Sequence, residues 1–184
     1  MKMIRKILAW YQKKQNPIGY ARKIGVTIGN NCKLITSPNW GSEPWLISIG
    51  NHTEVSFDVA FVTHDGATWV FRNEEAYEDV VKFGRINIGN DCFIGAKSVI
   101  LPGVTIGDYS IVAAGSVVNK DIHSGEVWGG VPAHFLMTTK EYADKCKRNT
   151  PEYDKENYRQ NFRDEVNKIC NKAEKRKLEK RENS

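Results

Sequence analysis

The chain has 184 residues, a net charge of +5 and a pI near 9.0, with the charge spread unevenly. Residues 1–42 carry eight Lys or Arg and no acid, residues 43–137 carry five against twelve, and residues 138–184 carry fourteen against ten. An acidic middle argues against a nucleic-acid-binding face over the body of the protein, so we expect no nucleic acid among its partners. The basic ends suit phosphates, acidic glycans or a membrane surface.

Residues 1–15 are predicted to form a basic amphipathic helix, because apolar residues recur at helical spacing from Ile4 to Tyr11 among lysines and arginines. Two interpretations stay open. The segment 1–23 caps the first coil of the fold, or its helix holds the protein weakly at a membrane surface. The apolar run Ile7–Tyr11 is too short for a signal peptide or a membrane span. We therefore expect a cytoplasmic protein, with the inner face of the membrane as the alternative location.

From Ile88 to His123, six consecutive six-residue units each open with an aliphatic residue. The openers are Ile88, Ile94, Ile100, Ile106, Val112 and Val118. The fifth places hold Cys92, Ser98, Val104, Ser110, Ser116 and Ile122. A period of six keeps one strand face pointing inward at every repeat and matches no helical period. This pattern predicts a stacked parallel β-helix over residues 24–137.

The same pattern occurs earlier in two other registers. Its openers there are Ile28, Leu34, Ile49, Val55 and Phe61. The offsets between these blocks are not multiples of six, so we expect two excursions from the coil. The first covers residues 36–45, and the longer second one protrudes over about residues 64–83. A long loop inside a repeat array costs conformational entropy without extending the core, and such loops are more often functional.

After Leu136 the period of six disappears, and residues 138–184 are expected to form a helical extension. One helix is predicted over Thr138–Arg148 and another from Pro151 to about Arg181, because Pro suits a first helical turn and an apolar stripe follows it. From Lys172 onward nearly every residue is polar, which predicts fraying or disorder.

The four cysteines are not clustered, and no Cys or His pair has the close spacing of a zinc site. Cys32 and Cys92 fall at the fifth place of their units and are expected to be core thiols. Cys146 and Cys170 lie in the polar C-terminal segment. Four unclustered cysteines favour a protein of a reducing compartment.

Three segments together resemble a known family. They are Ile94–Asp108 (IGAKSVILPGVTIGD), Ala114–Ile122 (AGSVVNKDI) and Gly129–Ala133 (GGVPA). Their order is similar to that of the hexapeptide-repeat acyltransferases, and most similar to the branch with maltose, galactoside and streptogramin acetyltransferases and the capsule and O-antigen O-acetyltransferases. The resemblance implies a mainly β fold, a left-handed parallel β-helix. It also implies a homotrimer with active sites between subunits, and acetyl-CoA as co-substrate without a metal.

The resemblance also implies that His64, on the protruding loop, is the catalytic residue. Acetyl transfer to a sugar hydroxyl needs a base, and imidazole suits that task near neutral pH. A backbone N–H would hold the oxyanion, and the transfer would be direct because Cys32 and Cys92 are expected in the core. Position alone leaves a purely structural loop histidine equally open. The candidates to orient its second nitrogen are Asp58, Asp65, Glu74 and a main-chain carbonyl.

We expect the protruding loop to contact the acceptor. The residues concerned are Asp65, Trp69, Phe71, Arg72 and Glu74. Trp69 and Phe71 suit a sugar ring and Arg72 suits a carboxylate or phosphate, although the two aromatic rings would equally well anchor the loop on a neighbouring subunit.

CoA contacts carry over from the resemblance. They fall on Ala96, Ala114, Asn119, Lys120 and His134. Small side chains at Ala96 and Ala114 would let the pantetheine arm approach the backbone, and Lys120 would lie near the nucleotide phosphates. His134 stands where Lys or Arg usually follows the Pro-Ala pair, and a mostly neutral imidazole makes a weaker phosphate contact.

The predicted function is O-acetylation of a sugar in the synthesis of a surface polysaccharide such as capsule or O-antigen. Acetylation that inactivates an antibiotic or another small molecule is the alternative. The γ-class carbonic anhydrases also use this fold, but they need three His ligands, and the four histidines of this chain are widely spaced. A non-catalytic trimeric scaffold is a third class, against which the intact His64 loop argues.

Overall fold

The computed structural model describes residues 11–182, which divide into two compact units after Thr139. Most of the predicted N-terminal helix lies outside the described residues. Its last part, residues 11–15, is helical.

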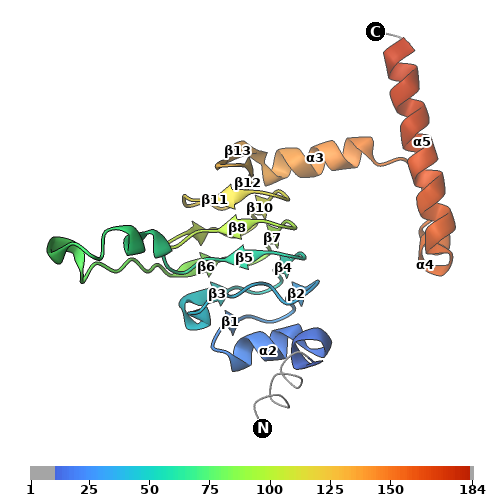
Figure 1. The fold of residues 1–184 in the computed structure, drawn as a ribbon. Coiled ribbons are helices and arrows are strands. Elements are labelled where there is room, and N and C mark those ends of the chain that lie inside the picture. Colours follow the sequence, from blue (N-terminus) through green and yellow to red (C-terminus); the bar gives the residue numbers. More distant parts are fainter. Residues whose placement is uncertain (1–10, 183–184) are drawn as a thin grey trace. The chain divides into compact units, whose positions relative to one another are not determined.

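The first unit is a β-helix of very short strands (Figure 1). The strands are β1 (Thr27–Ile28), β2 (Lys33–Leu34), β3 (Ile47–Ile49), β4 (Glu54–Val55), β5 (Ala60–Phe61), β6 (Ile86–Ile88), β7 (Phe93–Ile94), β8 (Val99–Ile100), β9 (Thr105–Ile106), β10 (Ile111–Val112), β11 (Val117–Val118), β12 (Glu126–Gly130) and β13 (Ala133–Thr138). They form three sheets in the orders β1-β3-β6-β9, β13-β12-β10-β7-β4-β2 and β11-β8-β5. Each sheet therefore takes one strand from each successive coil. Pairing is parallel except between β12 and β13, and the parallel β-helix predicted from the period of six is confirmed.

Helix α2 (Pro17–Lys23) packs against β1 and β2 at the first coil. Its Ala21 is fully buried. The guanidinium of Arg22 donates to the carbonyl oxygens of Ile28 at 2.9 Å and Gly29 at 2.8 Å. These bonds satisfy backbone acceptors at the open end of the β-helix, where no further coil supplies donors.

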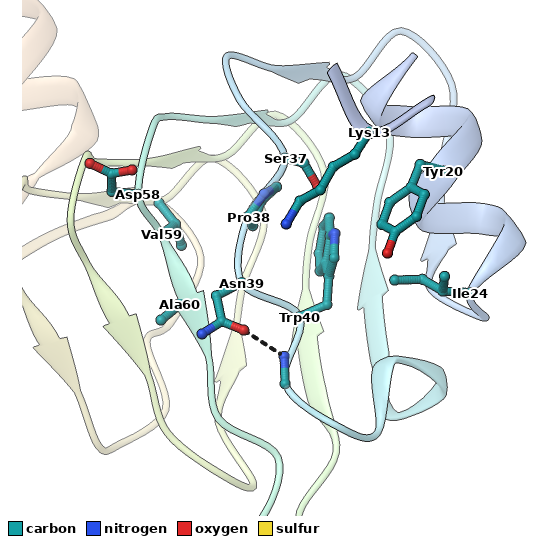
Figure 2. Close-up of a pocket in the computed structure, with 11 residues that line it drawn as sticks. Lys13, Tyr20, Ile24, Ser37, Pro38, Asn39, Trp40, Asp58, Val59 and Ala60 are labelled. Atoms are coloured by element: carbon teal, nitrogen blue, oxygen red, sulfur yellow. Dashed lines mark hydrogen bonds between the residues drawn. The ribbon is translucent and has the colours of Figure 1, made fainter. Parts of the chain in front are cut away.

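The prediction that residues 36–45 all leave the coil is wrong in part, because Asn39 and Trp40 complete the first coil (Figure 2). The Phe61 N–H donates to the Asn39 carbonyl at 2.9 Å. The Trp40 ring is buried and stacks on the ring of Phe61, with centroids 5.2 Å apart and planes 6° from parallel. Trp40 lies six residues after Leu34, so it is itself a unit opener.

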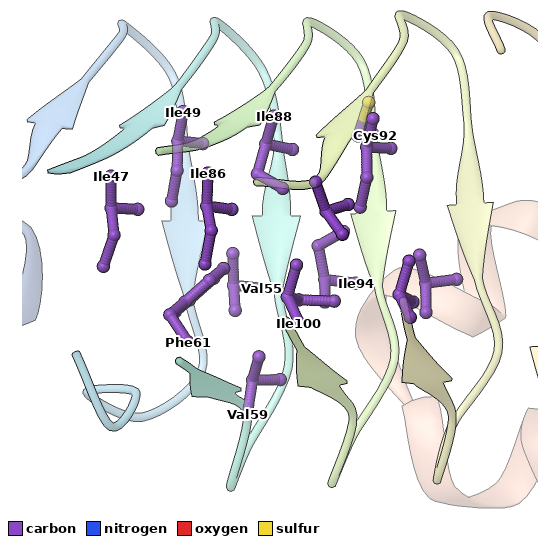
Figure 3. Close-up of a cluster of buried hydrophobic side chains, with 14 of the residues drawn as sticks. Ile47, Ile49, Val55, Val59, Phe61, Ile86, Ile88, Cys92, Ile94 and Ile100 are labelled. Carbon is purple, nitrogen blue, oxygen red and sulfur yellow. The ribbon is translucent and has the colours of Figure 1, made fainter. Parts of the chain in front are cut away.

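The predicted openers form the core of the β-helix, where their side chains stack from coil to coil between the three sheets (Figure 3). Each of them is at most 7% exposed. Complete burial of a Val, Ile or Phe side chain contributes about 1.5–3 kcal/mol. The inward face predicted from the period of six is therefore confirmed.

The fifth places are also buried, and their polar atoms bond to backbone carbonyls. The Ser98 hydroxyl donates to the Ala113 carbonyl at 3.1 Å, and the Cys92 thiol donates to the Gly107 carbonyl at 3.2 Å. Burial raises the pKa of Cys92, which keeps it a thiol. The predicted core thiol is confirmed for Cys92, whereas Cys32 is only half-buried.

Between β5 and β6 the chain projects from the coil as a long loop (Figure 1). It contains two 3₁₀ helices, Gly66–Val70 and Glu75–Tyr77. An antiparallel bridge between His64 and Phe83 closes its base. Another 3₁₀ helix, Pro44–Leu46, leads from the first coil into β3.

The second unit contains α3 (Thr139–Asn149), α4 (Lys155–Gln160) and α5 (Phe162–Glu182). The predicted helix from Pro151 to about Arg181 is wrong in part, because residues 151–154 are not helical and a break at Asn161 divides the rest into α4 and α5. Helix α5 extends to Glu182 although fraying is predicted from Lys172. Cys146 and Cys170 are exposed.

A buried carboxylate, that of Glu165, holds the turn between α4 and α5. It accepts from the Asp154 N–H at 3.0 Å and from the Asn157 side-chain amide at 2.6 Å. Asp154 itself caps α4 by accepting from two N–H groups of the first turn. Polar side chains thus end helix α4, although the apolar stripe predicts that the helix continues.

None of the helices within residues 11–182 combines the length and the apolar character that crossing a membrane requires. In the same part of the chain, no three His, Cys, Asp or Glu side chains gather as a metal site would need.

Candidate active site

Two loops meet at His64, which follows β5 at the base of the protruding loop. Its Nδ1 lies 2.9 Å from Oε2 of Glu43, which belongs to the segment that leaves the first coil after Trp40. The hydroxyl of Thr63 donates to the same oxygen at 2.7 Å. Because an ionised carboxylate only accepts, this hydrogen-bond network assigns the proton to Nδ1 and leaves the lone pair on Nε2.

The hydrogen bonds from Thr63 and then from His64 hold the pKa of Glu43 below its usual value of 4.5. Glu43 therefore stays ionised throughout the neutral range and keeps accepting from the imidazole. The stabilisation that these bonds give the folded state is fully present above about pH 4.5 and is lost as the pH falls through the lowered pKa.

Replacing Thr63 with Val should raise the pKa of Glu43, because Val has nearly the same shape but removes the first of these hydrogen bonds. Thr63 is fully buried, so water cannot replace its hydroxyl. The measurement is a ¹³C NMR titration of the Glu43 carboxyl carbon. Asp65 is the internal control, since the pKa of Asp65 is lowered chiefly by its bond from Lys82. An unchanged Glu43 titration would contradict this origin of the shift.

His64 lines a cavity of about 380 Å³, a size that suits a small-molecule ligand. The other lining residues are Ser42, Glu43, Asp65, Gly66, Thr68, Trp69, Arg72, Lys82 and Phe83. The Lys82 ammonium donates to Asp65 at 2.8 Å, and Arg72 Nε donates to the Val80 carbonyl at 3.3 Å. The cavity therefore combines a candidate base, two aromatic side chains and paired charges of both signs.

The structure brings His64, Asp65, Trp69 and Arg72 together at this cavity, but Phe71 and Glu74 do not line it. Phe71 packs edge-on against Tyr77, with ring centroids 5.7 Å apart. Glu74 is exposed on the loop.

The group that orients His64 is Glu43, which sequence reasoning missed. None of the predicted candidates bonds to Nδ1: Asp65 pairs with Lys82, Asp58 lines a different cavity, and Glu74 points into solvent. The period of six relates residues within coils, and it contains no signal that links the two loops.

The predicted CoA positions Ala96 and Ala114 occupy equivalent turns of successive coils. The Gly115 N–H donates to the Ala96 carbonyl at 2.8 Å, and the Lys97 N–H donates to the Phe57 carbonyl at 3.0 Å. Phe57, Ala96 and Ala114 therefore follow one edge of the β-helix. Small side chains at Ala96 and Ala114 leave the backbone of this edge approachable by an extended ligand.

The remaining predicted CoA contacts are exposed. Asn119 and Lys120 lie in the turn after β11. His134 lies on β13, paired with Gly129 of β12. All three thus belong to the C-terminal coils of the β-helix.

Comparison with known proteins agrees with this architecture. Residues 85–120 match the family described as bacterial transferase hexapeptide (six repeats). The chain is 41% identical over 139 residues to Protein CapG of Staphylococcus aureus, an alignment that covers 74% of this chain and 80% of CapG. The chain belongs to the hexapeptide-repeat acetyltransferase family. The family predicted from the repeat and the motif order is confirmed.

Solved structures of two hexapeptide-repeat acetyltransferases share the fold. A maltose O-acetyltransferase from Clostridium difficile 630 is 27% identical with a TM-score of 0.53, and the match covers 62% of this chain and 59% of that one. The hexapeptide-repeat-containing acetyltransferase VCA0836 from Vibrio cholerae is 26% identical with a TM-score of 0.52, covering 66% and 78%. These similarities support the left-handed parallel β-helix.

Proposed function

We propose that this acetyltransferase moves the acetyl group of acetyl-CoA to a hydroxyl of a sugar in the synthesis of a surface polysaccharide, with His64 as general base. The observation that carries the proposal is the pairing of His64 with Glu43 at the edge of a cavity of ligand size. The similarity to a maltose O-acetyltransferase supports a sugar hydroxyl as acceptor.

The reaction needs a base, because a neutral hydroxyl is a poor nucleophile. Nε2 of His64 takes the hydroxyl proton while the hydroxyl oxygen attacks the thioester carbonyl carbon. A backbone N–H donates to the negatively charged oxygen of the tetrahedral intermediate. The carbon–sulfur bond then breaks, and the CoA sulfur leaves with the proton returned by the imidazolium. The carboxylate of Glu43 stabilises that imidazolium through Nδ1–H.

In this proposal acetyl-CoA lies along the edge that contains Ala96 and Ala114, with Asn119, Lys120 and His134 near its nucleotide. The protein is a homotrimer in which the loop of one subunit faces this edge on the next. Large apolar side chains of the loop support such contacts, since Trp69 is 78% exposed and Val70 80% exposed within one chain. The four free cysteines are consistent with a cytoplasmic location.

The proposal is tested by the release of free thiol from acetyl-CoA, measured over a panel of nucleotide sugars, oligosaccharides and streptogramin-type drugs. Turnover with a saccharide alone supports sugar acetylation. Turnover with a drug alone overturns it in favour of antibiotic inactivation. If the protein binds acetyl-CoA but turns over no member of the panel, saccharides of these classes are not its acceptors.

Replacing Glu43 with Gln should lower kcat by about tenfold or more and leave KM nearly unchanged, because an amide neither stabilises the imidazolium nor fixes the tautomer. Steady-state kinetics over a range of pH measures the effect. The matched control is Glu75→Gln, which changes an exposed carboxylate on the protruding loop. Equal kinetics in the two variants would remove Glu43 from the mechanism.

A further inference from the structure

A second cavity, of about 460 Å³, lies beside α2 and the first coil (Figure 2). Its lining comes from the N-terminal helical segment, residues 37–41 and residues 58–60. In two of the lining residues a polar atom, Trp40 Nε1 and Ser37 Oγ, is buried and has no hydrogen-bond partner within residues 11–182. Trp40 is only 4% exposed. A buried N–H without an acceptor costs about 1–3 kcal/mol, so this cavity is suited to a ligand that accepts hydrogen bonds.

The polar groups of the cavity define the chemistry of that ligand. The indole N–H can only donate, and the Ser37 hydroxyl can also donate. Figure 2 shows Lys13 extending from the helical segment toward Ser37 and Trp40. Lys13 forms no ion pair with a described residue. An ammonium and two further donors around one cavity favour an oxyanion, a carboxylate or a phosphate.

Other lining groups suit the body of a sugar. Tyr20 lines the cavity, and Figure 2 shows its ring beside that of Trp40. Aromatic rings pack well on the apolar faces of sugar rings. Asp58 and Asn39 also line the cavity and lie on the side of Trp40 away from Tyr20 in Figure 2. The Asn39 side-chain oxygen accepts from the Gly41 N–H at 3.1 Å, whereas the Asp58 carboxylate can accept from sugar hydroxyls.

The position of the cavity relates it to the reaction. The turn at Phe57 and Asp58 stacks on the turn that contains Ala96, through the bond from Lys97 N–H to the Phe57 carbonyl. Ser37 lies in the turn of the coil before, since the Asn39 N–H donates to the Val59 carbonyl at 2.9 Å. The cavity thus continues the proposed CoA edge. With the nucleotide at the C-terminal coils, the thioester end of acetyl-CoA points toward this cavity.

We infer that the cavity lined by Lys13, Ser37 and Trp40 binds the acceptor through a sugar unit that bears a carboxylate or a phosphate. This inference rests on the proposed function and adds the class of sugar to it.

The test follows the indole N–H signal of Trp40 by ¹⁵N NMR, assigned by its loss in Trp40→Phe, in the presence of three probes. The probes are methyl glucuronide, glucose 1-phosphate and methyl glucoside. We expect the signal to shift with one or both anionic probes and not with the neutral glucoside. A response to glucuronide alone identifies a uronic acid, and a response to glucose 1-phosphate alone identifies a sugar phosphate. No shift with either anion, or an equal shift with the neutral probe, overturns the inference.

Lys13→Gln should weaken binding of the anionic probe about tenfold, the effect of losing one charge-assisted hydrogen bond. Lys23→Gln is the matched control, because Lys23 bonds to Gln12 and does not line this cavity. Circular dichroism checks that each variant is folded. Equal affinity of Lys13→Gln and wild type overturns the assigned role of Lys13.

Binding and turnover separate the two proposals. His64→Ala should bind the anionic probe like wild type, since His64 does not line this cavity. Probe binding without any acetyl transfer would overturn the proposed function and keep the site. Acetyl transfer to anionic sugars with unchanged KM in Lys13→Gln would overturn the site and keep the function.

Discussion

Replacing His64 with Ala should lower kcat for acetyl transfer by about a hundredfold to ten-thousandfold, the usual contribution of a positioned general base. The variant should still bind CoA, because the proposed CoA edge contains no part of the His64 loop. Free-thiol release gives the rate, and calorimetric titration with CoA gives the affinity. A variant that turns over like wild type would show that His64 is not the base.

His52→Ala is the matched control for this experiment. His52 also pairs with a carboxylate, since its Nδ1 lies 2.6 Å from Asp91, but it is exposed and lines neither of the two cavities described above. Its loss should leave the rate unchanged. Adding Glu43→Gln to His64→Ala should cause little further loss, because a residue that acts through the imidazole has no effect once the imidazole is gone. Independent, additive losses would contradict that dependence.

Replacing Ile94 with Ala should lower the free energy of unfolding by about 2–5 kcal/mol, as expected for a large-to-small change in a packed core. Ile94 is fully buried on β7, between the coils of β4 and β10. The loss combines the transfer free energy of the deleted groups with the cavity that they leave. Denaturant unfolding at a fixed protein concentration measures it.

Phe93→Ala on the same strand supplies the control. Phe93 precedes Ile94 and points outward, with 38% of its surface exposed. Although more atoms are deleted, we expect a loss of about 1 kcal/mol or less. A larger loss for Phe93 than for Ile94 would contradict the assignment of inward and outward faces along β7.

The β-helix could be predicted because its signal is local and repeated. An inward position every six residues requires an apolar side chain each time, so the openers from Ile88 to Val118 mark the core without any knowledge of distant contacts. The same rule passed over Trp40, because Trp40 lies nine residues before the next opener, Ile49, and is therefore out of phase with it. In the C-terminal unit, the buried carboxylate of Glu165 and the cap at Asp154 decide where helices begin and end. These polar contacts cannot be predicted from the spacing of apolar residues.

The candidate site could be predicted only in part. His64 could be proposed because the period breaks just after it and the resemblance implies a histidine on the protruding loop. Glu43 and Lys82 come from other points of the two excursions, and their positions depend on how each loop folds back. A period describes the coil and not the loops that leave it. Contacts between loops therefore need the structure, as does the cavity beside Trp40.

The protruding loop also bears on how the chain folds. Strands β7 and β10 pair residues 18 positions apart, Phe93 with Ile111, whereas β4 and β7 pair residues 39 positions apart, Glu54 with Phe93. Chain closure over the longer distance costs only about 0.7 kcal/mol more. We expect the coils after the loop to form first, since their contacts are more local, and the earlier coils to add afterwards. A loop long enough to hold the proposed base thus costs the fold about as much as one buried methylene group contributes.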